Sequence, residues 1–293
     1  MSDRENSDDS AAFCADLVRG HDFVRYASTL FVPADRRRAL LALYAFNVEI
    51  SRVRDQVSQP LPGEIRLQWW TDMLVGEGQR GAEGSGAEGN PVAAELRRAI
   101  ANFHLPVDPL SRLIDEHQFD LYNDPMPTLA ALEGYLTETT SALFALAARI
   151  AGSPFIEAEH LARHAGLAQG FTNVIAALPR DASRRQLFVP LQLLENNGCS
   201  MEEVFSGRQT PKLRGALLHL IGEARKHLDT SFELLADLPA QVRLIFLPLS
   251  LVGRELDHML RADADLFMPH VRSRLSILWT LWRASRSEIF RGR

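Results

Sequence analysis

The sequence predicts an all-α protein with a single domain. Apolar residues recur at three- and four-residue spacing over long stretches, most clearly over 40–53, as they do on one face of a helix. No comparable run alternates with period two, and no Asn-Gly dipeptide joins two alternating runs as in a hairpin. No repeat of fixed period is present, which argues against a solenoid.

The predicted helices follow one another along the chain. Asp35 is a suitable N-cap for the first of them, which continues for about 20 residues, because its side chain can accept a hydrogen bond from the first turn. The same apolar spacing predicts helices over 63–76, 91–104, 108–122, 128–151, 156–178, 211–237, 240–265 and 273–289.

Two segments outside these helices complete the domain organisation. Residues 1–20 are predicted to be a disordered or weakly ordered acidic tail, because the first ten residues carry four acids against one arginine. Residues 21–293 are expected to form one domain with a mobile Gly-rich loop at 76–90. This loop contains the spacing G-x-G-x-x-G, but it follows a helix and not a strand, so a nucleotide site is not expected.

The composition is that of an ordinary water-soluble globular protein. Of the 293 residues, 46% are hydrophobic and 24% are charged, which supports a packed core and argues against disorder. The longest apolar stretch, 244–252, is interrupted by Pro248 and is far shorter than the roughly 20 residues of a membrane span. Cys14 and Cys199 provide neither a disulfide framework nor a metal quartet, so a reducing compartment is expected.

The distribution of charge bears on partners and location. The net charge is −5, most of it from the first ten residues, so the body of the protein has no basic field of the kind that binds nucleic acid. The acidic start argues against a mitochondrial transit peptide, and no apolar signal core follows it. A cytoplasmic protein is therefore expected, with peripheral contact at the inner face of the membrane left open.

Two helical segments each have a plain and a functional interpretation. His160 and His164 are four residues apart, a spacing that can bind a metal, but packed or solvent-facing histidines are favoured because no third ligand is evident. The C-terminal helix combines apolar residues with several arginines, and Glu288 is its only acid. It is interpreted as a packed helix with a solvated basic face, and contact with an anionic membrane surface is the alternative.

Two regions of the chain resemble the squalene/phytoene synthase family. They are RYASTLFVPADRRRALLALYAFNVEISRVRD (25–55) and GLAQGFTNVIAALPRDASRRQLFVP (166–190), and the likeness extends over about 22–285. The resemblance implies an all-α terpenoid-synthase (isoprenoid synthase) fold around a deep apolar cavity. It also implies two Asp-rich helices at the mouth, where Mg²⁺ would bridge carboxylates to a departing diphosphate.

The first of these Asp-rich motifs is altered in this chain. The family pattern D-D-x-x-D falls on 51–55, where Ser51 and Arg52 replace the first two acids and only Asp55 remains. A guanidinium where Mg²⁺ would bind is repulsive, and arginine does not lose its proton near neutral pH. The motif is therefore expected to be degenerate.

The second motif is altered at its centre. The family pattern N-x-x-x-D-x-x-x-D falls on Asn173, Ala177 and Asp181 and lacks the middle acid. Pro179 is expected to end or kink the helix that should align these residues. Gly170 replaces the glutamine that the family usually has three residues before the asparagine. By resemblance, Asp55, Asn173 and Asp181 are remnant motif positions and would be metal ligands only if Mg²⁺ is bound.

Arginines cluster in the two altered motifs. They are candidate ligands for a phosphate or an anionic head group, which guanidinium forks can hold without a metal. Ion pairs with Asp55, Asp181 and nearby acids are the equally weighted alternative. The residues concerned are Arg52, Arg54, Arg180, Arg184 and Arg185.

Two functional hypotheses follow from the resemblance. The stretches AFNVEISRVRDQVS (45–58) and SRRQLFVP (183–190) look like the branch of the family that contains a mitochondrial respiratory complex I assembly factor. This branch implies a role in assembly of the respiratory complex, with a complex subunit or assembly protein as partner. The degenerate motifs favour a non-catalytic protein without a cofactor, and a retained apolar cavity would suggest a bound isoprenoid or lipid. The alternative is Mg²⁺-dependent head-to-head condensation of prenyl diphosphates. A plain helical scaffold would instead lack a cavity at the motifs.

Overall fold

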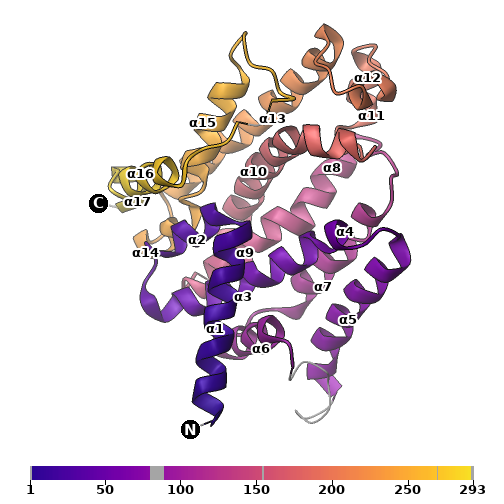
Figure 1. The fold of residues 1–293 in the computed structure, drawn as a ribbon. Helices are drawn as coiled ribbons and strands as arrows, with labels where there is room; N and C mark the ends of the chain where they lie inside the picture. Colours follow the sequence, from indigo (N-terminus) through magenta and orange to yellow (C-terminus); the bar gives the residue numbers. More distant parts are fainter. Residues whose placement is uncertain (1, 80–88, 154, 269, 292–293) are drawn as a thin grey trace.

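The described residues form a helical assembly without β-strands. The computed structural model describes residues 2–79, 89–153, 155–268 and 270–291, and the predicted all-α class is confirmed for them (Figure 1). Its α-helices are α1 (Ser2–His21), α2 (Phe23–Thr29), α3 (Ala34–Ser51), α4 (Val53–Gln56), α5 (Pro60–Gln79), α6 (Pro91–Phe103), α7 (Val107–Glu116), α8 (Leu129–Leu136), α9 (Ala142–Ile150), α10 (Phe155–Ser183), α11 (Leu191–Asn196), α12 (Met201–Phe205), α13 (Pro211–Leu235), α14 (Ala240–Arg243), α15 (Leu249–Met259), α16 (Arg274–Ser285) and α17 (Glu288–Arg291).

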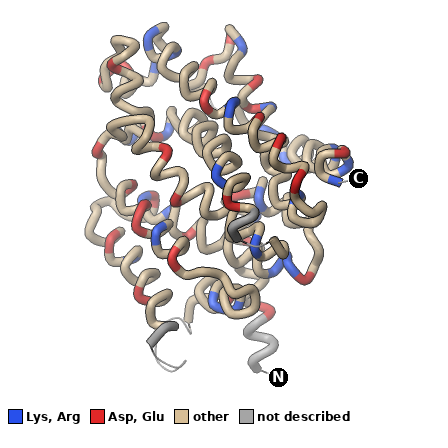
Figure 2. Tube along the Cα trace, turned by 180° about the vertical axis from the view of Figure 1, so that it is seen from behind, with Lys and Arg blue, Asp and Glu red and all other residues tan. Residues whose placement is uncertain are grey.

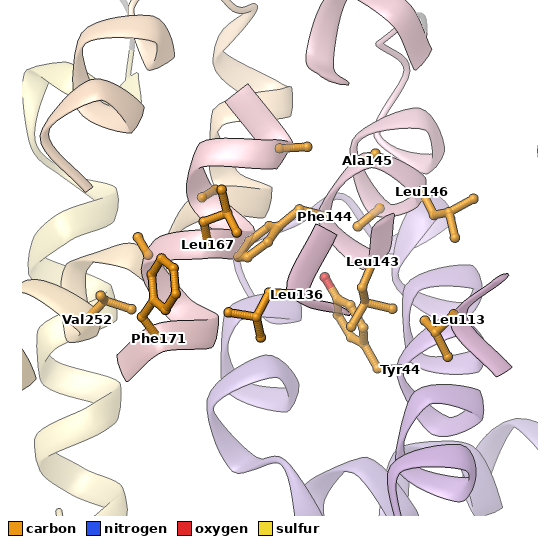
Figure 3. Packing of buried hydrophobic residues seen from close by; sticks show 14 of the residues in the cluster. Tyr44, Leu113, Leu136, Leu143, Phe144, Ala145, Leu146, Leu167, Phe171 and Val252 are labelled. Atoms are coloured by element: carbon orange, nitrogen blue, oxygen red, sulfur yellow. The ribbon is translucent and has the colours of Figure 1, made fainter. Parts of the chain in front are cut away.

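The core lies around α10, which packs against α8, α9, α13 and α15. Side chains from several helices meet there, as Figure 3 shows for Leu136, Phe144 and Phe171. Phe144 stacks on Phe246 with ring centroids 5.3 Å apart, which joins α9 to the segment before α15. Burial of these large apolar side chains is the main favourable term in folding, and it fixes the central helices that carry the second motif.

A π-helical turn, Thr137–Ser141, separates α8 from α9. A Cβ atom added to Gly166 on α10 would overlap the backbone of Ser141, so the two helices approach each other backbone to backbone at this point. The Ser141 hydroxyl donates a hydrogen bond of 3.1 Å to the carbonyl of Arg163 and reinforces the contact. The predicted single helix over 128–151 therefore contains a local irregularity.

The first Asp-rich motif lies at a break between two helices. α3 ends at Ser51, and Arg52 has backbone angles of φ −100° and ψ 1° that separate it from α4. Residues 51 and 55 are therefore not on one continuous helix face. At the other end of α3, Pro33 occupies the N-cap position and Asp35 lies in the first turn, so the predicted cap is wrong by two residues.

The N-terminal segment differs from the predicted tail. Residues Ser2–His21 form α1, which packs against α3 and α6, and the side chains of Cys14 and Val18 are buried. These two residues are four apart and share one helix face, so burial of that face outweighs the polar composition of the segment. The expectation of a disordered or weakly ordered tail therefore does not describe the packed part of α1.

Other differences concern the ends and breaks of helices. α5 continues to Gln79, and residues 80–88 of the predicted Gly-rich loop lie outside the described residues. The stretch predicted as one helix over 240–265 is divided into α14, a short 3-10 helix and α15. Pro248 lies at the second break. Proline has no backbone N–H, so it cannot donate the hydrogen bond that would continue the helix. None of the described helices combines the length and hydrophobicity that crossing a bilayer requires.

Candidate functional site

A pocket of about 610 Å³ lies at the two altered motifs. Its lining comes from the α1–α2 junction, the end of α3, α4, the segment around His117, the π-helical turn and α10. This volume is within the range of small-molecule sites in proteins, roughly 300 to 1,000 Å³. The presence of a cavity at the motifs argues against the hypothesis of a plain helical scaffold, which would have no cavity there.

The pocket is more polar than the deep apolar cavity that was expected. Five arginines and four aspartates are among its lining residues, and the apolar part includes Leu136, Val174 and Phe188. A Cβ atom at Gly170 would collide with the side chain of Leu136, which therefore occupies the space beside that residue. The pocket is suited to a charged head group with a limited apolar contact.

The structure brings together seven of the eight candidate site residues. They line the pocket from both motifs and are Arg52, Arg54, Asp55, Asn173, Arg180, Asp181 and Arg184. Arg185 is the exception, because its positive φ of 55° takes the chain out of α10 and its side chain pairs with Glu202. Its guanidinium also lies 4.6 Å from the ring centroid of Phe205, so Arg185 belongs to a neighbouring surface contact.

Both acids that remain in the motifs are paired with arginines. Arg184 forms an ion pair with Asp55 and so connects the end of α10 to α4. The Nε of Arg180 lies 3.0 Å from Oδ1 of Asp181. Burial raises the pKa of the Asp181 carboxyl, and the adjacent Arg180 opposes that rise. Arg180, Arg184 and Arg185 therefore form ion pairs with acids of the motifs or nearby, and Arg180 and Arg184 also line the pocket.

The two arginines of the first motif differ from the others. Among the described residues, no carboxylate lies within ion-pair distance of Arg52 or Arg54. Arg54 donates only one long bond, 3.4 Å from Nη1 to the carbonyl of Val57, and its buried Nε has no partner. An unpaired buried donor costs free energy, so an anion reaching Arg54 would gain from satisfying it.

A hydrogen-bonded cluster on another wall of the pocket was not predicted. His117 Nδ1 lies 2.7 Å from Oδ2 of Asp120, and the hydroxyl of Tyr135 donates to Oδ1 of Asp120 over 2.9 Å. Burial and the Asp120 carboxylate raise the pKa of Tyr135 well above its ordinary value. The spacing of His117 and Asp120, three apart, is the sequence signal that could have suggested this pair.

The helix that contains Pro179 does not end at this proline. α10 continues through Pro179 to Ser183, and Asn173, Ala177 and Asp181 all line the pocket. The neighbouring side chains of Leu178 and Ala182 are buried, so tertiary packing holds the last turns of the helix despite the missing donor.

The residues at the motifs do not fit a Mg²⁺ cluster. Such a cluster needs several carboxylate oxygens free to bind the metal. Here Asp55 and Asp181 each accept from an arginine, and Arg52 places a further cation on the same pocket wall. In the described part of the chain, no group of three or more acidic, histidine or cysteine side chains is arranged to hold a metal ion.

The histidines of α10 have a partner on α13. Nδ1 of His164 lies 2.8 Å from Nδ1 of His227, so one ring donates and the other accepts, and His160 packs edge-on against His164. Burial lowers the pKa of both His164 and His227. This arrangement supports packed histidines in place of a metal site.

Comparison with known proteins relates the chain to one family. The family model described as squalene/phytoene synthase matches residues 18–283. "NADH dehydrogenase (ubiquinone) complex I, assembly factor 6" of Rattus norvegicus is 31% identical over 92% of this chain and 80% of the relative. The phytoene synthase of Thermus thermophilus is 28% identical over 71% of this chain and 69% of the relative.

Solved structures support the fold. A squalene synthase from Alicyclobacillus acidocaldarius superposes with a TM-score of 0.73 at 22% identity, covering 85% of this chain and 92% of that chain. A dehydrosqualene synthase in complex with a ligand has a TM-score of 0.83 at 15% identity, covering 96% of this chain and 97% of that chain.

Proposed function

Because the chain belongs to the squalene/phytoene synthase family, we propose that it is a non-catalytic member that binds the anionic head of an isoprenoid or lipid and assists respiratory complex I assembly. The binding residues are Arg52 and Arg54, with Arg180 and Arg184 at the opposite motif. The bound group is a diphosphate or similar phosphorylated head, held by guanidinium forks and not by a metal.

The observation that carries this proposal is the pairing of charges in the pocket. Asp55 and Asp181 are occupied by Arg184 and Arg180, whereas Arg52 and Arg54 have no carboxylate partner among the described residues. Two unpaired guanidinium groups on a pocket wall favour an anion there. The pocket as a whole therefore favours a bound phosphate over a bound divalent cation.

The assembly role is supported by the relatives. The rat and human proteins named as complex I assembly factor 6 match the chain over more than nine tenths of its length, with 31% and 29% identity. We propose that this chain acts in the cytoplasm, at the inner face of the membrane, with a subunit or assembly protein of complex I as its partner. Holding a lipid-like ligand would then be part of that role.

The binding step is tested with farnesyl diphosphate by isothermal titration calorimetry, once with a chelator and once with Mg²⁺. We expect binding under chelator, and a double change of Arg52→Gln and Arg54→Gln should weaken it at least about tenfold, because two charge-assisted contacts are lost. Arg185→Gln is the matched control, because that arginine lies outside the pocket. Binding that requires Mg²⁺ rejects the direct contact with arginine.

The catalytic alternative is tested by Mg²⁺-dependent release of diphosphate from farnesyl and geranylgeranyl diphosphate. We expect no turnover, because stabilisation of the leaving group supplies orders of magnitude in rate and the motif acids are engaged elsewhere. Turnover that Asp55→Asn abolishes contradicts the non-catalytic proposal.

The assembly role is tested by deleting the gene in the organism that encodes it and measuring assembled complex I and NADH:quinone reductase activity in membranes. We expect both to fall and to return with the wild-type gene. Rescue by the Arg52→Gln, Arg54→Gln variant would separate assembly from ligand binding, and an unchanged complex I level would contradict the assembly role.

A further inference from the structure

The surface made by α16 and the segment just before it is unusually apolar. Five of the fourteen large apolar residues that are exposed in the described part of the chain lie between 268 and 282. We call them the α16 face: Met268 is 70% exposed, Val271 85%, Leu275 78%, Trp279 60% and Trp282 39%. Exposed apolar side chains clustered in this way mark interaction sites.

The helix geometry separates this face from the core. Leu275, Trp279 and Trp282 follow one another at four- and three-residue spacing on one side of α16. Ile277 and Leu281 are buried, and α16 packs against α15 and α2. The rings of Trp279 and Trp282 stack with centroids 4.9 Å apart, which makes a compact aromatic surface on the exposed side.

Arginines without carboxylate partners flank this face. Arg274, Arg283 and Arg286 are exposed, and none has an ion pair among the described residues, whereas Arg272 is engaged by Glu255. The guanidinium of Arg286 lies 4.4 Å from the ring centroid of Trp282, at the edge of the apolar stripe. Figure 2 shows basic segments gathered near the C terminus.

The geometry points to an anionic lipid bilayer as the partner of the α16 face. Tryptophan is suited to the membrane–water interface, and arginines beside an apolar stripe are attracted to acidic head groups. A second copy of the chain fits less well. In a two-fold dimer the same patch would meet itself, and its arginines would oppose arginines.

α2 connects the α16 face to the pocket. The two helices α16 and α2 pack against each other (Figure 1). The guanidinium of Arg274 lies 4.8 Å from the ring centroid of Phe23, the first residue of α2. The preceding residue, Asp22, and Arg25 in the first turn of α2 both line the pocket. Docking through α16 would therefore hold the pocket close to the bilayer, which deepens the proposed function by giving a source for its lipid-like ligand.

The test is sedimentation with vesicles of phosphatidylcholine alone or mixed with phosphatidylglycerol. We expect binding to the mixed vesicles that weakens with salt, and a blue shift of tryptophan emission on binding. Trp279→Ser with Leu275→Glu, and separately Arg283→Glu with Arg286→Glu, should each weaken binding about tenfold or more. Leu61→Glu on α5 is the control, since Leu61 is 63% exposed but lies on a helix that does not pack against α16.

Two outcomes overturn the inference. One is equal or absent binding to both kinds of vesicle, and the other is self-association of the wild type that the α16 variants abolish while vesicle binding is unchanged. The proposed function is tested separately in solution. α16 variants should keep their affinity for farnesyl diphosphate, whereas the Arg52→Gln, Arg54→Gln variant should keep vesicle binding.

Discussion

Arg184 forms an ion pair with Asp55, so a cation at the end of the second motif holds the one acid that remains in the first. In a metal-dependent site this carboxylate would be turned to Mg²⁺. Here it pairs with an arginine, whereas Arg52 and Arg54 on the same pocket have no carboxylate partner among the described residues.

Asp55→Asn should strengthen metal-free binding of a diphosphate. The change removes a negative charge from the pocket and releases Arg184 to bind the diphosphate. We expect roughly fivefold tighter binding, because a partly exposed ion pair is worth up to about 1 kcal/mol. Calorimetry under chelator measures it. Glu202→Gln releases Arg185 outside the pocket and should leave the affinity unchanged. Weaker binding by the Asp55→Asn variant would identify Asp55 as a ligand of the bound group or its metal.

Gly166→Ala should destabilise the fold. The new methyl group would overlap backbone atoms of Ser141, which cannot rotate away, and we expect a loss of about 3 kcal/mol in the free energy of unfolding. Denaturant titration gives the value. Gly222→Ala on α13 is the control, because nothing lies near its added Cβ, and it should stabilise by up to about 1 kcal/mol. Equal effects of the two changes would contradict the backbone contact.

The His164–His227 pair should make folding stability depend on pH. Burial lowers the pKa of both imidazoles in the folded state, so the unfolded chain binds protons more readily. Stability is therefore full above about pH 6.5, the ordinary histidine value, and declines as the pH falls below it. Glu223, Arg163 and Lys226 also act on His227. Denaturation at several pH values should show a shallower decline for His227→Gln than for the wild type, and parallel curves would contradict the pair's role.

α1 should contribute to stability through its buried face. Val18→Ala removes two buried methyl groups, and we expect a loss of about 2 kcal/mol. Arg19→Ala on the exposed side should change stability by less than about 0.5 kcal/mol. Cys14 gives a second measurement, because burial raises the pKa of its thiol to about 12 and should make alkylation slow. Faster alkylation is expected in the Val18→Ala variant, and equally fast alkylation in the wild type would show that α1 is not packed.

The all-α class and most of the long helices could be predicted from the sequence, because the three- and four-residue spacing of apolar residues can be recognised in one sequence. α13, for example, lies within the predicted 211–237, and its buried residues recur at three and four positions. Short helices such as α11 and α12 carry too few residues for a period to be visible, and their ends are set by the segments they pack on. α1 was misjudged because its polar residues dominate the composition, whereas a few buried side chains determine its structure.

The site could be predicted in outline but not in its charge pairing. The motif positions identify a pocket wall, and seven of the eight candidates line it. Arg185 follows Arg184 in sequence, yet a single positive φ sends it to Glu202. Likewise, only tertiary structure brings Tyr135 to Asp120, fifteen residues earlier. Spacing along one helix contains no information on such partners.

The π-helical turn Thr137–Ser141 also constrains how this pocket can change by insertion or deletion. Deleting one residue there would convert its i→i+5 hydrogen bonds into the i→i+4 bonds of a regular α-helix and leave the turns on either side in register. The hydrogen bond of Tyr135 to Asp120 and the contact of Ser141 with Gly166 on α10 would then both be kept. A single codon lost in this turn would thus reshape only the part of the pocket wall that Thr139 and Thr140 form, and the helices on either side would keep their places.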